Sequence, residues 1–273
     1  MAVIIPIRFA RAPLGAFFAV TLLTAAPQAS LVAQTADANV LSTVAAASPS
    51  NAAKVPFFVG EKLEYDVKLS ALRVGSGSME VLEITDVRGK ASWHTVFRVS
   101  GSIPFFRVND RYESWFDVTT LTSRRFFQDI EEGGYKPKRH YEMFPERGMY
   151  QQNQEPEKPT VSDPLDDGSF LYFVRTLSLD VGKTYSFSRY FNPDANPVKI
   201  FVARRETVTT PAGTFKCVVL KPTFRSKGLF SENGNAEIWI TDDDARVMVQ
   251  LKTKLPFGSL NLYLRAHNAK IAH

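Results

Sequence analysis

The stretch 107–135 carries most of the side chains with which this chain could do chemistry. β-Branched and aromatic residues alternate with charged ones on both sides of Thr119 and Thr120, a pattern typical of two strands joined by a turn. The carboxyl groups available for a catalytic pair are Glu113, Asp117, Asp129, Glu131 and Glu132. Two carboxylates that flank a bond can act as general acid and base, and their separation is not visible in a sequence. A carboxylate-dependent hydrolase is therefore one hypothesis.

One face of this predicted hairpin brings charged residues together with an aromatic ring. Because successive side chains of a strand point to opposite faces, five candidate ligand-binding residues share it: Arg111, Glu113, Trp115, Arg125 and Asp129. We expect Asp117 to lie opposite Ser123. Arg111 then faces Asp129 as an ion pair. By the same register Trp115 faces Arg125 as a cation–π pair. This face either forms an outward ladder of cross-strand pairs or lines the inside or rim of a cavity, where charges must be paired to be tolerated.

The sequence lacks the motifs of the other common chemistries. The histidines show no paired spacing that would suit a metal: His94, His140, His267 and His273. No G-x-S-x-G, catalytic-cysteine, P-loop or G-x-G-x-x-G pattern occurs. The acidic run 163–168 lacks the alternating ligands of a calcium loop and suits helix capping better. We therefore expect no metal, no cofactor and no catalytic residue.

These side chains must be positioned by strands, because strand-like segments with short turns between them recur from 57 to 266. Such a succession implies an antiparallel meander, and a sheet of about a dozen strands tends to curl or close. We expect an all-β fold, a large antiparallel, strongly curved sheet or barrel with one packed amphipathic helix. Cys217, the sole cysteine, lies in an apolar strand and is expected to be a small core residue.

The one convincing helix is predicted to begin at Asp163. Asp163 suits the N-cap position, and Pro164 suits the first helical position. Apolar residues recur at helical spacing and must be buried against the sheet: Leu165, Phe170, Phe173, Val174 and Leu177. Arg175 is expected to point away from this apolar stripe.

Six short segments occur in an order and spacing that resemble a known family. They are DRYESW (110–115), DIEEGGY (129–135), DPL (163–165), TPAGTF (210–215), IWITDD (238–243) and KLPFGSL (254–260). From about 57 to 264 the chain resembles the bacterial family DUF3108, whose domain has no known function. The resemblance implies a mostly β envelope protein of Gram-negative bacteria, and it supplies no reaction and no catalytic residues.

The N-terminal residues have the form of a secretory signal. Arg8 and Arg11 precede an uncharged apolar run, 12–26, which is shorter than the roughly 20 residues that span a bilayer. We expect a signal peptide over 1–29, with cleavage as late as 38, then a disordered linker over 30–56, a single β domain over 57–266 and a tail over 267–273. Loss of the two arginines lowers the net charge from +5 to +3. The sequence therefore predicts a periplasmic protein with no transmembrane span in its mature form and no nucleic-acid partner.

Most apolar residues of the chain lie in predicted strands, and no catalytic motif is present. Burial of apolar surface is therefore the main interaction that the chain can offer a ligand. The leading hypothesis is non-catalytic binding of a lipid or other hydrophobic ligand in the concave sheet. The helix would act as a lid and add Phe170, Phe173 and Arg175 to the ligand-binding set, while Arg111 and Arg125 would meet an anionic headgroup. The alternatives are an envelope scaffold with a filled barrel that binds a protein partner, and the hydrolase.

Overall fold

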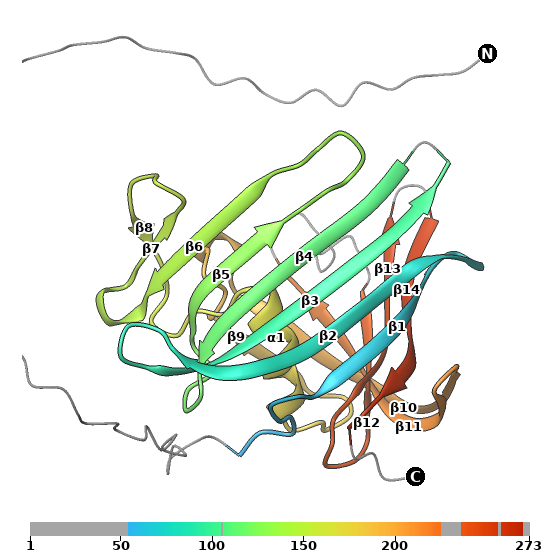
Figure 1. The fold of residues 1–273 in the computed structure, drawn as a ribbon. Helices are drawn as coiled ribbons and strands as arrows, with labels where there is room; N and C mark the ends of the chain where they lie inside the picture. The colour runs from blue at the N-terminus through green and yellow to red at the C-terminus, as the bar shows by residue number, and fades with distance from the viewer. Residues whose placement is uncertain (1–53, 105, 225–235, 256–257, 270–273) are drawn as a thin grey trace, which may run out of the picture. The chain divides into compact units, whose positions relative to one another are not determined.

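The structure is a computed structural model of the 273-residue chain, and it describes residues 54–104, 106–224, 236–255 and 258–269 (Figure 1). The expected signal peptide, the linker up to 53 and the tail beyond 269 lie outside these residues. The described part forms a fourteen-stranded antiparallel sheet and one α-helix, which confirms the expected all-β fold. No helix within the described ranges reaches the length and hydropathy needed to cross a bilayer.

The first half of the sheet is a meander in which each strand pairs with the next one along the chain. Its strands are β1 (Lys62–Leu69), β2 (Leu72–Asp86), β3 (Ala91–Ile103), β4 (Phe106–Asp117), β5 (Ser123–Asp129), β6 (Lys138–Phe144), β7 (Met149–Gln152) and β8 (Lys158–Pro159). A 3₁₀ turn, η1 (Pro145–Arg147), separates β6 from β7.

The second half is another meander, and it follows the helical segment. Its strands are β9 (Thr184–Phe187), β10 (Val198–Thr210), β11 (Gly213–Thr223), β12 (Glu237–Thr241), β13 (Met248–Leu255) and β14 (Gly258–His267). A 3₁₀ turn, η3 (Pro193–Ala195), lies between β9 and β10. The strands of both meanders lie between 62 and 267, in agreement with the strand-like segments predicted over 57–266.

The first strand joins the two meanders, because β1 pairs with β2 on one side and with β14 on the other. The β1–β14 register runs from Leu63 opposite His267 to Leu69 opposite Leu260. The order is therefore β8 to β1 followed by β14 to β9, and the outermost strands β8 and β9 each have one partner among the described residues. The sheet is curled and is not closed into a barrel (Figure 1).

Strand β3 continues through Gly101 and ends at Ile103. Gly101 and Gly75 are Cα partners in the β2–β3 ladder. A Cβ atom added to Gly75 would lie 1.9 Å from the carbonyl oxygen of Ser100, so only glycine fits this position. The glycines thus permit a close approach of the two backbones, and they do not end the strand.

The α-helix lies on the concave side of the sheet, behind β3 and β4 in the view of Figure 1. It consists of α1 (Asp167–Phe173) and a 3₁₀ extension, η2 (Val174–Thr176). The N-cap is Asp166, so the prediction of Asp163 as the cap is wrong by three residues. Leu165 instead forms an isolated parallel bridge with Tyr190, which keeps the chain extended up to the cap.

One main hydrophobic core joins both halves of the sheet through the helix. It contains Val81 of the first meander, Phe170 and Val174 of the helical segment, and Ile238 and Leu251 of the second meander. Residues 168–173 are all buried, so the helix fills the concave side instead of covering an empty one. Cys217 is 1% exposed in this core, which confirms the sequence prediction.

Arg175 is buried at the end of the helical segment, and the expectation that it points away from the core is wrong. Its side chain is fully buried, and Nη1 and Nη2 donate to the two carboxylate oxygens of Glu61 at 2.6 and 2.8 Å. The remaining donor capacity goes to the backbone carbonyls of Pro56, Ala245 and Arg246 at 2.8–3.1 Å. Arg175 thus ties the start of the sheet and the β12–β13 turn to the helix, and its donors are engaged within the protein.

We predict that Arg175→Met lowers the free energy of unfolding by about 3–5 kcal/mol, because the carboxylate of Glu61 is left buried without a cation. Chemical denaturation of the mature protein measures this loss. The double variant Glu61→Gln/Arg175→Met should recover part of it, since it carries no unpaired charge. A double variant that is less stable than Arg175→Met alone would contradict this account.

Candidate functional site

The hairpin residues singled out by the sequence lie on the outer face of the sheet. On β4, Ser114 contacts the cap of α1 and Phe116 enters the main core, so Arg111, Glu113 and Trp115 point the other way. The register pairs Arg111 with Asp129 and Trp115 with Arg125, as predicted. The pairing of Asp117 with Ser123 is wrong, because an irregularity after Trp115 places Phe116 opposite Ser123.

Contacts on this outer face form a ladder of cross-strand pairs. The guanidinium of Arg125 lies 5.7 Å from the ring centroid of Trp115, which confirms the predicted cation–π pair. The imidazole of His94 stacks on the same indole at 4.3 Å. One nitrogen of His94 lies 2.9 Å from a carboxylate oxygen of Glu113 and the other lies 3.3 Å from Glu83. The outward interpretation of the hairpin face is therefore the correct one.

The predicted ion pair between Arg111 and Asp129 does not form, although the two residues are Cα partners. Arg111 instead pairs with Glu113 two residues along its own strand, at 2.8 Å. Asp129 pairs with Lys138 of the next strand, at 2.9 Å. Within the described ranges, no group of three His, Cys, Asp or Glu residues could hold a metal ion. These charged side chains of the outer face are thus paired with one another.

A buried polar cluster surrounds the N-terminus of α1, and the pKa of one of its carboxyl groups is raised. Asp166 Oδ1 accepts hydrogen bonds from the N–H groups of Gly168 and Ser169 and from the hydroxyl of Ser114. The Ser123 hydroxyl accepts from the Asp166 N–H at 3.0 Å and lies 2.7 Å from the Ser169 hydroxyl. Asp166 and Ser169 thereby form a capping box that is fastened to β4 and β5.

Burial raises the pKa of the Asp166 carboxyl to about 6, although the hydroxyls of Ser114 and Ser123 and the N–H of Ser169 favour its charged form. Its second oxygen, Oδ2, is buried without a donor, which adds to the cost of the charge. Ser114 and Asp166 are 1% and 0% exposed, and no histidine contacts them in the hydrogen bonds above. This cluster can cap and orient a helix, and it gives a substrate no access to the serine hydroxyl.

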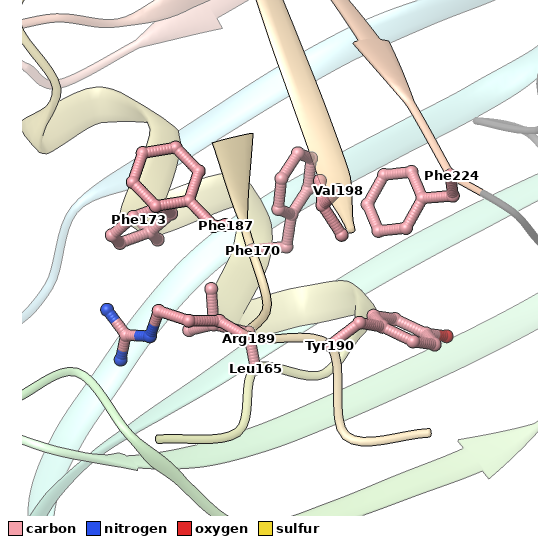
Figure 2. Close-up of a pocket in the computed structure, with 8 residues that line it drawn as sticks. All are labelled: Leu165, Phe170, Phe173, Phe187, Arg189, Tyr190, Val198 and Phe224. Carbon is pink, nitrogen blue, oxygen red and sulfur yellow. The ribbon is translucent and has the colours of Figure 1, made fainter. Parts of the chain in front are cut away.

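Phe170 and Phe173, which the sequence predicted as ligand-binding residues, line an apolar opening between α1 and β9 (Figure 2). We call it the aromatic cleft, and it is formed by Leu165, Phe170, Phe173, Phe187, Arg189, Tyr190, Val198 and Phe224. The rings of Phe173 and Phe187 meet edge to face with centroids 5.1 Å apart. The empty volume is about 210 Å³, part of it open to solvent, and the side chains leave no room for a separate water molecule.

Arg189 places a cation in the aromatic cleft, and sequence reasoning missed it. Its Nε donates to the carbonyl of Asp163 at 2.9 Å and its Nη2 to the carbonyl of Thr120 at 3.2 Å. The guanidinium lies 4.9 Å from the ring centroid of Phe173. Burial lowers the pKa of Arg189, and the nearby charge of Asp163 partly offsets that effect. The structure therefore combines an apolar surface with one partly desolvated positive charge.

Tyr190 links the aromatic cleft to the polar cluster at the helix cap. Its hydroxyl donates to Asp167 Oδ1 at 2.8 Å, and Gln128 donates to the other oxygen of Asp167 at 3.3 Å. Burial raises the pKa of Asp167, while the hydrogen bond from Tyr190 lowers it. One wall of the cleft is thus held in place by hydrogen bonds to the first turn of α1.

The comparisons with known proteins bear on the fold. The sequence model of the family described as "Protein of unknown function (DUF3108)" matches residues 64–265. A β-barrel-like protein of the domain of unknown function DUF1849 from Brucella abortus is similar in structure, with a TM-score of 0.50 and 10% identity over 78% of this chain and 99% of that one. A presumed lipoprotein from Parabacteroides distasonis gives a TM-score of 0.36 and 12% identity over 78% and 98% of the two chains. No curated protein matches the sequence.

We predict that the contribution of Asp166 to the stability of this protein falls as the pH rises from about 4 to about 6. The folded-state pKa of Asp166 is raised above its unfolded value, so the folded state binds more protons in this window and loses that advantage on deprotonation. This contribution decreases by about 2 kcal/mol between pH 4 and pH 6. Denaturant titrations at several pH values measure the slope.

Asp166→Asn should flatten this slope, because the cap then has no proton to lose and asparagine remains a good N-cap residue. The burial of Asp110 raises its pKa to about 6 as well, so part of the slope should remain. Asp194→Asn, which changes an exposed carboxyl group, is the matched control and should leave the slope intact. An equal slope in wild type and Asp166→Asn would contradict the assignment.

Proposed function

We propose that this chain, which belongs to the DUF3108 family, is an exported, non-catalytic protein that binds the apolar part of a hydrophobic ligand in the aromatic cleft. The observation that carries the proposal is the lining of that cleft, where five aromatic and two aliphatic side chains surround a space that is partly open to solvent. Ligand sites are mostly apolar hollows with a few placed polar groups, and this cleft has that character.

The N-terminal sequence supports an exported, periplasmic protein. Two arginines followed by a short uncharged apolar run and small residues form the pattern of a cleaved secretory signal. An envelope location would give the protein access to lipids and other amphiphiles, which are the hydrophobic ligands in that compartment.

The contacts of the carboxylates that the sequence offered for catalysis support a binding role over hydrolysis. Glu113 contacts both Arg111 and His94, Asp117 contacts Arg124, and Asp129 contacts Lys138. A general acid–base pair needs two carboxyl groups that face a shared space. These groups lie along a ladder of ion pairs, and none of the three lines the aromatic cleft.

The small size of the cleft limits what it can hold. Its empty volume of about 210 Å³ is below the range of about 300–1,000 Å³ that is usual for drug-sized ligands. Burial of five methylene groups would contribute about 4 kcal/mol before the cost of association. We therefore expect one chain of a ligand to enter, with movement of the aromatic rings, and burial of these methylene groups alone to give a Kd no tighter than about 1 mM.

A partner-binding envelope scaffold is the second candidate, and the filled interior of the sheet favours it. Residues of the helix and of both meanders occupy the space that a carrier with a large lumen would leave open. The scaffold needs no ligand in the aromatic cleft, so a binding measurement separates the two functions.

We predict that the mature protein binds the neutral fluorescent probe N-phenyl-1-naphthylamine and that Phe187→Gln weakens this binding about tenfold. The ligand would leave the new amide without water or a partner, which costs about 1–3 kcal/mol. Fluorescence titration gives the Kd.

Phe201→Gln is the matched control, because Phe201 lies on the adjacent strand and points to the opposite face between the buried Ile200 and Val202. It should change the Kd by less than about twofold. Absence of binding to the wild-type protein, or equal losses in both variants, would remove the aromatic cleft as the site and leave the scaffold.

A further inference from the structure

Arg189 is half-buried and has no carboxylate partner in the described part of the chain, in contrast to the buried Arg124 and Arg175, which each pair with one. Arg175 is neutralised by both oxygens of Glu61. The two hydrogen bonds of Arg189 go to backbone carbonyls, of Asp163 and of Thr120, which carry no net charge. Asp163 is exposed and forms no ion pair with Arg189 among the described residues, although its charge raises the pKa of Arg189. A partly buried cation thus keeps its charge at the border of an apolar surface.

The contacts of Arg189 also fix where this charge lies. The carbonyls of Asp163 and Thr120 hold Nε and Nη2, and the Phe173 ring lies beneath the guanidinium. Figure 2 shows the guanidinium at the Phe173 end of the aromatic cleft, with Tyr190 and Phe224 at the other end. An anion at Nη1 would complete the hydrogen bonding of a group whose orientation is already set, and such charge-assisted bonds are the strong ones.

We propose that the ligand is a single-chain amphiphile with an anionic head, whose chain enters the aromatic cleft and whose head binds Arg189. This inference rests on the proposed function and adds the chemical class of the ligand. Because Arg189 has no carboxylate partner among the described residues, charge complementarity favours a negatively charged head. The small volume of the cleft selects one chain over two.

The arginines that the sequence offered for an anionic headgroup do not compete for this role. Arg111 and Arg125 lie on the outer face of the sheet, where Glu113 and Glu142 neutralise them at 2.8 and 2.5 Å. They are separated from the cleft by the sheet itself, because the residues between them on β4 and β5 point into the interior. The anion site is therefore assigned to Arg189 alone among these three.

The test compares two ligands that differ in the head and share the chain, dodecanoate and dodecanol. Calorimetric titration of the mature protein at pH 7.5 and at monomeric ligand concentrations gives both dissociation constants. Wild type should bind dodecanoate at least tenfold more tightly than dodecanol. Arg189→Gln should remove this difference by weakening dodecanoate binding while dodecanol binding changes less than twofold. Added salt should weaken only the binding of dodecanoate.

Two further variants serve as controls. Arg111→Gln removes an arginine from the outer face and should leave both ligands unaffected. Arg189→Lys keeps the charge and should retain part of the preference for dodecanoate even if Arg189→Gln folds poorly, which thermal unfolding would reveal. Equal binding of the two ligands by wild type, or equal losses for both in Arg189→Gln, would overturn the anionic head and leave the apolar cleft in place. If wild type binds neither ligand, the proposed function fails as well.

Discussion

Both ends of α1 are buried inside the curled sheet, so their polar groups must be satisfied by protein and not by water. At the N-terminus, Asp166 caps the first turn and is itself held by Ser114 on β4. At the other end, Arg175 binds Glu61 and the carbonyls of the β12–β13 turn. A seven-residue helix has little stability of its own. The helix therefore exists because two polar anchors and a shared core fix it to both meanders.

The anchored helix determines where an apolar opening can remain. With the helical segment fixed at both ends, Phe170 and Phe173 are presented toward β9 and the residues that follow it. The parallel bridge between Leu165 and Tyr190 brings the chain after β9 back against the start of the helix. Arg189 is carried into this position by the same bridge, since its carbonyl accepts from the Leu165 N–H at 2.5 Å. The cleft and its cation are thus consequences of the way the helix is held.

The sequence predicts the strands of this fold far better than the site. Alternation gave nearly every strand and the hairpin partners of Trp115, because local side-chain periodicity decides those features. The sequence predicted the helix cap at Asp163 and not at Asp166. The reason is that the bridge of Leu165 to Tyr190 is a long-range contact, and residue preferences for capping positions carry no information about such contacts. The sequence also set Arg175 apart from the core, since one charged residue on an apolar helix gives no sign of a partner 114 residues away. Arg189 was missed for the same reason.

The open form of the sheet explains why the aromatic cleft lies at its border and not in a central lumen. A closed barrel satisfies all strand edges, whereas this sheet ends in β8 and β9, which have two and four residues. Short terminal strands limit edge-to-edge association, and Pro159 in β8 removes one of the edge donors. The interior next to the middle strands is filled by the helix, and the aromatic cleft lies beside the outermost strand β9. Phe187 at the end of β9 lines this cleft, whose position follows from a sheet that curls without closing.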